Sequence, residues 1–199
     1  MTSSAAPQPP ISAKPRTLVT AFGPFGGRSE NASNLALKQL RQAQPWVRTR
    51  TLPVDSVIAP KMLRAALRQI KPELVIHLGE AGGTRSIHLE ESAWNLMDFR
   101  IPDNAGRQPQ SRCISPGCPN ELRTPLPVGA LRSHLSDQGF PVVLSNNPGR
   151  YLCNQIYYIS RLLGERALFV HLPLASEMPT NIAAKALELT VSFLTKAPR

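Results

Sequence analysis

Residues 149–164 read GRYLCNQIYYISRLLG and place a cysteine, Cys153, at the start of a predicted helix. Apolar residues recur through this stretch at helical spacing, and Gly164 supplies a stop signal. Residues 167–173, ALFVHLP, follow as a short apolar strand that carries His171. A helix that leads directly into a buried strand is the repeating unit of an α/β fold.

The same alternation extends over the rest of the chain. Apolar runs predict further strands at 17–22, 49–54, 73–78 and 140–145, and helical spacing predicts helices at 33–40, 56–70, 127–138 and 180–194. The alternation predicts a single-domain, three-layer α/β/α sandwich over residues 17–199, with a largely parallel, mixed central sheet. Residues 87–99 look strand-like in their second half, and the polar, Pro- and Gly-rich segment 103–125 is predicted to be an excursion or lid.

Composition and charge narrow the class of protein. The chain has 199 residues, of which 42% are hydrophobic, and this suits one compact domain with a substantial core. No apolar run approaches the ~20 residues that a membrane span needs. The net charge of +10 comes from scattered Lys and Arg residues, which favours a solvated basic surface over a nucleic-acid site. Residues 1–16 are rich in Ser, Ala and Pro and lack the apolar centre of a secretory signal, so we expect a disordered tail and a cytoplasmic protein.

Two of the three cysteines, Cys113 and Cys118, lie close together in the polar segment. They have the spacing of a disulfide or of half a metal site. A zinc site needs four ligands, and the sequence shows no second Cys/His pair at ligand spacing. In a reducing cytosol we expect two free thiols, and no metal or organic cofactor.

Cys153 is the candidate nucleophile. Backbone N–H groups at a helix start favour negative charge, and the thiolate is the reactive form of cysteine. A thiol nucleophile needs a base, and His77 and His171 both lie late in apolar strands, in Val-Ile-His-Leu and Phe-Val-His-Leu. A lone strand histidine is more often a buried structural residue, so spacing does not choose between them.

The carboxylate that would fix the histidine's tautomer is equally open. Glu90 and Glu91 are adjacent, and a solvent-facing pair of charges is the simpler interpretation. Asp98 and Asp103 are further candidates. Composition and spacing do not decide among these four residues.

Two glycine-rich loops, residues 23–27 and 79–83, follow predicted strands. Neither loop has the Gly-Lys-Ser/Thr ending of a P-loop or the spacing of a dinucleotide site. Phe22 and Phe25 flank the first loop and suggest a small apolar pocket, although core packing is the common fate of phenylalanine. Ligands of such sheets bind beyond the carboxyl ends of the strands, so we expect both loops, Cys153 and His171 to converge on one edge.

Several separate motifs, in the same order, resemble the pyroglutamyl peptidase I family, the pyrrolidone-carboxylate cysteine peptidases. The resemblance extends from about residue 17 to 173 and rests on AFGPFGG at 21–27, GEAGG at 79–83, residues 90–95, RIPDN at 100–104 with Gly106 and Gln108-Pro109, residues 149–154, and FVHLP at 169–173. It implies a phosphorylase/hydrolase-like fold, frequent homo-oligomers, and hydrolysis of N-terminal pyroglutamyl residues from small peptides. From the scattered charges and the lack of a long apolar run, we expect no nucleic-acid or membrane partner.

The resemblance also assigns roles to residues. Cys153 matches the family nucleophile, His171 the general base and Glu90 the carboxylate that orients the histidine. The residues that match its substrate-binding positions are the aromatic Phe22, Phe25 and Tyr151, together with Arg100 near the catalytic centre and Glu80, whose backbone would help to hold the lactam.

The chain departs from the usual family pattern at four positions. Gly23 stands in place of aspartate, Glu80 in place of glutamine, Thr84 in place of a common arginine and Tyr151 in place of a common phenylalanine. Glu80 adds a charge beside the lactam position. The alternative hypothesis is therefore a catalytically altered member that binds a small cyclic, lactam-like ligand.

Overall fold

The computed structural model describes residues 16–197. The tail predicted at residues 1–16 lies outside the described residues, apart from Arg16. The carbonyl oxygen of Arg16 accepts a 2.7 Å hydrogen bond from the backbone N–H of Glu73. Arg16 therefore contacts the chain just before the strand that begins at Leu74.

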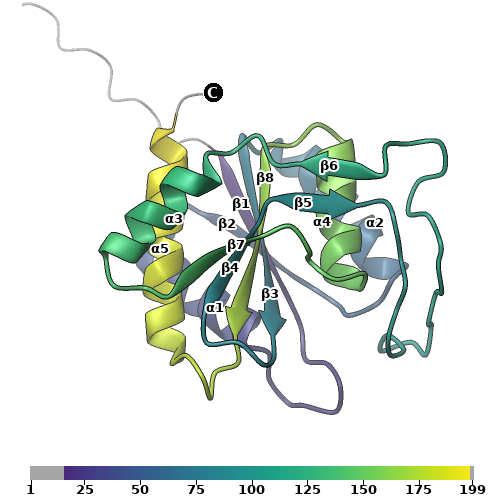
Figure 1. Cartoon of the computed structure of the whole chain (residues 1–199), viewed down its shortest axis with the longest axis horizontal. Coiled ribbons are helices and arrows are strands. Elements are labelled where there is room, and N and C mark those ends of the chain that lie inside the picture. Colours follow the sequence, from purple (N-terminus) through teal and green to yellow (C-terminus); the bar gives the residue numbers. More distant parts are fainter. Residues whose placement is uncertain (1–15, 198–199) are drawn as a thin grey trace, which may run out of the picture.

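A six-stranded sheet in the order β2-β1-β3-β8-β4-β7 forms the centre of the fold (Figure 1). Its strands are β1 (Thr17–Phe22), β2 (Arg48–Leu52), β3 (Leu74–Ala81), β4 (Ile87–Glu90), β7 (Val142–Ser145) and β8 (Ala167–Pro173). β2, β1, β3 and β8 run parallel, whereas β4 is antiparallel to β8 and parallel to β7. The predicted largely parallel, mixed sheet is confirmed.

Helices cover both faces of this sheet and complete the three layers. α1 (Ala32–Ala43), α3 (Val128–Asp137) and α5 (Thr180–Lys196) pack together on one face. α2 (Ile58–Ile70) and α4 (Leu152–Leu162) pack on the other. Each face has its own cluster of buried apolar side chains, so the sheet separates two cores. The predicted α/β/α sandwich is confirmed.

Residues 87–99 differ from the prediction made for them. Their strand structure lies in the first half, in β4 and in β5 (Ser92–Trp94), and it ends at Trp94. The side chain of Asn154 binds the backbone at the end of this strand: Oδ1 accepts from the N–H of Trp94, and Nδ2 donates to the carbonyls of Trp94 and Leu96. A side chain of α4 thus satisfies these backbone groups.

The polar segment 103–125 is tied to the domain at several points. Its last part forms β6 (Glu121–Arg123), which pairs with β5 in a small antiparallel sheet. At its start, the buried carboxylate of Asp103 accepts hydrogen bonds from the backbone N–H and the hydroxyl of Ser56. Cys113 and Cys118 are free thiols within it, as expected. Among residues 16–197, no helix is long and apolar enough to cross a membrane.

Candidate active site

Three parallel strands, β1, β3 and β8, end at the same edge of the sheet, and α4 begins there. Cys153 is the second residue of α4. Over residues 16–197, no side chain caps the start of this helix, so its first backbone N–H groups stay available to a negative charge. The register of β3 and β8 sets His171 opposite Gly79.

Gly79 lets the helix approach the sheet closely enough for catalysis. A Cβ atom at this position would lie 2.8 Å from the ring of Phe169 and 3.0 Å from the sulfur of Cys153. Both approaches are shorter than van der Waals contact. The close approach therefore requires glycine, which lets the Cys153 sulfur lie against β3, beside His171 on β8.

His171 bonds a buried carboxylate. Its Nδ1 atom lies 2.8 Å from Oε1 of Glu90, whose side chain is 1% exposed. Burial by itself would lower the pKa of His171. The hydrogen bond and charge of Cys153, and then those of Glu90, outweigh burial and raise the pKa from 6.5 to about 10. The imidazole of His171 thus lies between the sulfur of Cys153 and the carboxylate of Glu90, and both partners favour its protonated form.

The other candidate carboxylates make different contacts. Glu91 pairs with Arg123 at 3.6 Å, Asp98 accepts a hydrogen bond from the backbone of Ser111, and Asp103 binds Ser56. Within the described part of the chain, only Glu90 among these four has a recorded hydrogen bond to His171. Its backbone is also fixed, because the Tyr157 hydroxyl donates to its carbonyl oxygen at 2.9 Å.

The other strand histidine has a structural environment. His77 is completely buried, with Nδ1 2.7 Å from the Thr20 hydroxyl and Nε2 2.8 Å from the Ser160 hydroxyl. Burial lowers its pKa to about 3, so the ring is neutral and bonded on both sides. His77 is thus a buried structural residue, and both of its ring nitrogens are hydrogen-bonded to hydroxyl groups.

A cavity of about 300 Å³ opens beside the Cys153 sulfur. All of the predicted binding residues line it, namely Phe22, Phe25, Glu80, Arg100 and Tyr151. The Tyr151 ring lies 5.2 Å from Phe25 and 4.4 Å from Phe99, centroid to centroid, and its hydroxyl donates to the carbonyl of Pro102 at 3.0 Å. The tyrosine is therefore held as an aromatic wall with its polar end already satisfied.

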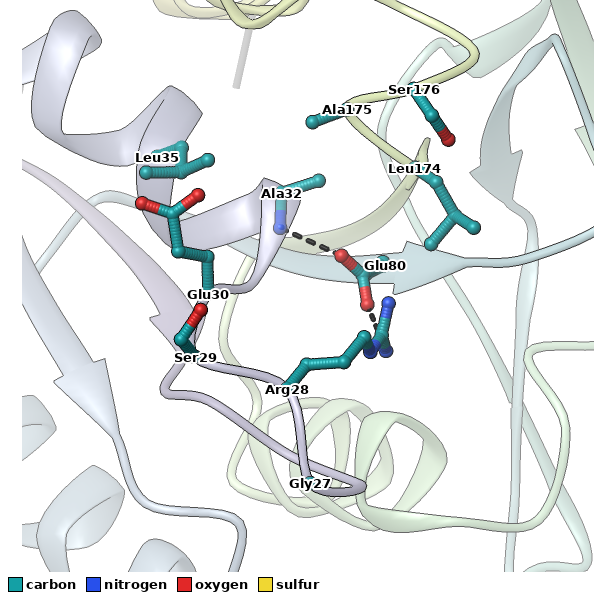
Figure 2. Close-up of a pocket in the computed structure, with 10 residues that line it drawn as sticks. All are labelled: Gly27, Arg28, Ser29, Glu30, Ala32, Leu35, Glu80, Leu174, Ala175 and Ser176. Carbon is teal, nitrogen blue, oxygen red and sulfur yellow. Dashed lines mark hydrogen bonds and ion pairs between the residues drawn. The ribbon is translucent and has the colours of Figure 1, made fainter.

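The charge that Glu80 is expected to add beside the lactam position is neutralised in the structure. One carboxylate oxygen accepts from the backbone N–H of Ala32, the first residue of α1, at 2.8 Å. The other oxygen pairs with the Arg28 guanidinium, as Figure 2 shows. A helix N-terminus and a cation both stabilise an anion. The side chain thus points to α1, and the wall of the cavity carries a compensated charge.

Sequence reasoning missed three contributors to this site. Phe99 supports Tyr151, Arg28 neutralises Glu80, and His88 lies opposite His171 in the β4–β8 pair. Burial and the neighbouring imidazole hold the pKa of His88 down, whereas Glu90 acts in the opposite direction. None of the three has a local signal, because each depends on strand register or on a loop that folds back.

A thiol at a helix start, a histidine, a buried carboxylate and an adjoining apolar cavity are the parts that cysteine hydrolases use. A family model described as pyroglutamyl peptidase matches residues 15–193. A pyrrolidone-carboxylate peptidase from Clavibacter michiganensis is 36% identical over 171 residues, which cover 82% of this chain and 80% of that protein. One from Pyrococcus furiosus is 38% identical over 148 residues, covering 73% and 71%.

Solved structures agree with these relatives. The pyrrolidone carboxyl peptidase from Thermococcus litoralis has a TM-score of 0.84 at 33% identity, covering 90% of this chain and 93% of that one. Pyroglutamyl peptidase I from Bacillus amyloliquefaciens has a TM-score of 0.86 at 29% identity, covering 92% and 98%. The chain belongs to the pyroglutamyl peptidase family of cysteine peptidases. The resemblance and the fold class expected from the sequence are confirmed.

Proposed function

We propose that the chain hydrolyses the bond after an N-terminal pyroglutamyl residue, with Cys153 as nucleophile, His171 as general base and acid, and Glu90 as the orienting carboxylate. The observation that carries the proposal is the series of contacts from Cys153 to His171 to Glu90, with Cys153 lining the aromatic cavity. Names of the relatives point to the same substrate class.

The cavity suits a neutral, flat ring. Phe22, Phe25 and Tyr151 supply apolar walls, and the charge of Glu80 is already neutralised by Arg28 and the start of α1. A pyroglutamyl lactam has no free ammonium group, so it needs flat walls and a few hydrogen bonds rather than a bare carboxylate. In this proposal backbone groups beside Glu80 bind the lactam amide.

In the first step the Cys153 thiolate attacks the pyroglutamyl carbonyl carbon and forms a C–S bond. Backbone N–H groups at the start of α4 stabilise the oxyanion, with Arg100 at the rim of the cavity. One such donor contributes about 3 kcal/mol to lowering a barrier. As the C–N bond breaks, the imidazolium of His171 gives its proton to the leaving nitrogen.

In the second step water hydrolyses the thioester. Neutral His171 takes a proton from the water, the new C–O bond forms, and the C–S bond breaks to regenerate the thiolate. Glu90 stabilises the imidazolium that results, through the 2.8 Å contact to Nδ1. Pyroglutamate leaves as the free acid. In both steps His171 carries the proton that is transferred.

Release of a fluorophore from a pyroglutamyl arylamide tests the proposal. We expect turnover by the native chain and none by Cys153→Ala. The matched control substrate is a prolyl arylamide, which keeps the ring but lacks the lactam carbonyl, and should not be cleaved. Absence of turnover by a correctly folded native chain would overturn the proposal. Stabilisation of that inactive chain by 2-pyrrolidone would then support the lactam-binding alternative.

We also propose the cellular compartment and the substrates of this activity. The thiols of Cys113, Cys118 and Cys153 are all free, which suits the reducing cytoplasm that a thiol nucleophile needs. Small peptides with an N-terminal pyroglutamate are the proposed substrates. The homo-oligomer expected from the family resemblance stays a prediction, which the mass in solution would test.

A further inference from the structure

A second cavity, of about 470 Å³, adjoins the Cys153 cavity on the side of α1. The two cavities share Arg28, Glu80 and Leu174 as lining residues. Figure 2 shows the 27–30 loop and the start of α1 on one side, and residues 174–176 on the other. The Arg28–Glu80 pair therefore forms a common wall of the two cavities.

The proposed mechanism fixes the side on which the leaving part of the peptide lies. The aromatic rings of the first cavity hold the pyroglutamyl ring. His171 must face the leaving nitrogen, because it donates the proton to that atom. The strand that carries His171 ends at Pro173, and the next residues, 174–176, line the second cavity. Leu174 lines both cavities, so a peptide that passes His171 and follows this loop reaches the second cavity.

Two acidic residues and one basic residue line the second cavity, in a chain whose net charge is +10. These charged residues are Arg28, Glu30 and Glu80. Arg28 is paired with Glu80, and Glu80 also holds the first backbone N–H of α1. Glu30 has no ion pair recorded over residues 16–197, and Figure 2 shows its carboxylate beside Leu35. One carboxylate is therefore left to meet a ligand.

We propose that this second cavity binds the leaving part of the peptide, and that Glu30 selects a basic side chain there. The inference rests on the proposed function, since it needs the leaving chain to pass His171. Leu35 and Leu174 provide an apolar surface for the methylene stem of lysine or arginine, and Glu30 meets the charged end. Pyroglutamyl peptides that continue with a basic residue are the preferred substrate class.

The test compares kcat/KM for three peptide amides in which pyroglutamate is followed by lysine, norleucine or glutamate. We expect the order lysine, norleucine, glutamate. Glu30→Gln, which keeps the shape of the side chain, should lower the lysine-to-norleucine ratio roughly two- to fivefold, the range for a partly exposed ion pair. Arg28→Gln should raise the same ratio, because Glu80 then loses its cation. Added salt should lower the ratio in the native chain.

The control variant is Glu188→Gln, which removes one negative charge on α5, where Glu188 pairs with Lys185. It should leave the lysine-to-norleucine ratio unchanged. The pyroglutamyl arylamide separates the two proposals. A chain that does not cleave it overturns both of them. A chain that cleaves it, but whose ratio does not respond to Glu30→Gln, overturns the binding site for basic side chains alone.

Discussion

Two histidines on neighbouring strands occupy nearly the same local sequence and have opposite environments. His77 on β3 and His171 on β8 both face α4, where they meet Ser160 and Cys153. Cys153 and Ser160 are seven residues apart, about 10 Å or two turns along one helix face. The Phe169 ring lies between the histidines, 6.2 Å from His77 and 4.7 Å from His171, centroid to centroid.

The difference lies in what surrounds each ring. Two neutral hydroxyls satisfy His77 deep in the sheet, and burial lowers its pKa to about 3. At the sheet edge, Cys153 and Glu90 overcome burial and raise the pKa of His171 to about 10. The same residue type is thus a structural element in one place and a proton carrier in the other, because the partners differ in charge.

The largest expected effect comes from the two helix residues that meet these rings. Cys153→Ala should lower kcat/KM by at least about 10⁴-fold, since it removes the nucleophile and leaves only the binding contribution. Ser160→Ala should keep turnover and reduce the free energy of unfolding by about 1 kcal/mol, since His77 loses one hydrogen bond. Arylamide turnover and urea unfolding of both variants measure the contrast. Comparable turnover in the two variants would refute the assignment of the nucleophile.

The next effect distinguishes two adjacent carboxylates. Glu90→Gln should lower kcat roughly 10³-fold, because a neutral amide no longer stabilises the imidazolium of His171. Glu91→Gln is the matched control. It removes an exposed ion pair with Arg123 and should stay close to native activity. Steady-state kinetics decide, and equal losses would remove the orienting role from Glu90.

Gly79→Ala should lower activity less than Glu90→Gln does, and it should also reduce stability. The added methyl group meets the Phe169 ring and the Cys153 sulfur, so the strand and helix must separate. We expect a loss of about 1–3 kcal/mol in stability and a fall in kcat on the order of 10²-fold. Gly129→Ala is the control, because a Cβ there meets nothing within 4 Å. Native kinetics in Gly79→Ala would show that the close approach is dispensable.

The two rings should also give opposite pH dependences of stability. The folded-state pKa of His77 is lowered, so its contribution is complete above pH 6.5 and is lost as the pH falls toward 3. The folded-state pKa of His171 is raised, so its contribution is complete below pH 6.5 and is lost as the pH rises through about 10. Each contributes at most about 1.4 kcal/mol per pH unit.

Urea unfolding from pH 4 to pH 10 tests this pair of slopes. His77→Gln should flatten the acid side only, and His171→Gln the alkaline side only. A variant that flattens the opposite side, or both sides equally, would contradict the environments described for the two rings.

Much of the fold could be predicted from local patterns. Periodicity predicted α4 and β8 well, because each has one strongly apolar face or run. The prediction for residues 87–99 was wrong in its second half, since the backbone after Trp94 bonds the Asn154 side chain and the 112–120 segment, which are distant in sequence. The strand predicted at 73–78 extends to Ala81, because β8 pairs with it as far as Pro173.

The candidate site was only partly predictable from the residues themselves. Cys153 could be proposed from its place at a helix start, but spacing did not decide between His77 and His171, or among four carboxylates. The family resemblance selected His171 and Glu90, and the structure brings both together with Cys153. Their catalytic roles stay proposals.

The sequence by itself determined the alternation of helices and strands, a cysteine at a helix start and an aromatic-rich loop after the first strand. These follow from local periodicity and from turn residues, which act over a few positions. Only the tertiary structure decided which histidine meets a carboxylate, that Arg28 and the start of α1 neutralise Glu80, and that a second cavity adjoins the first. The physical reason is that strand order and register bring distant residues within hydrogen-bonding range, and short-range forces then set their charge.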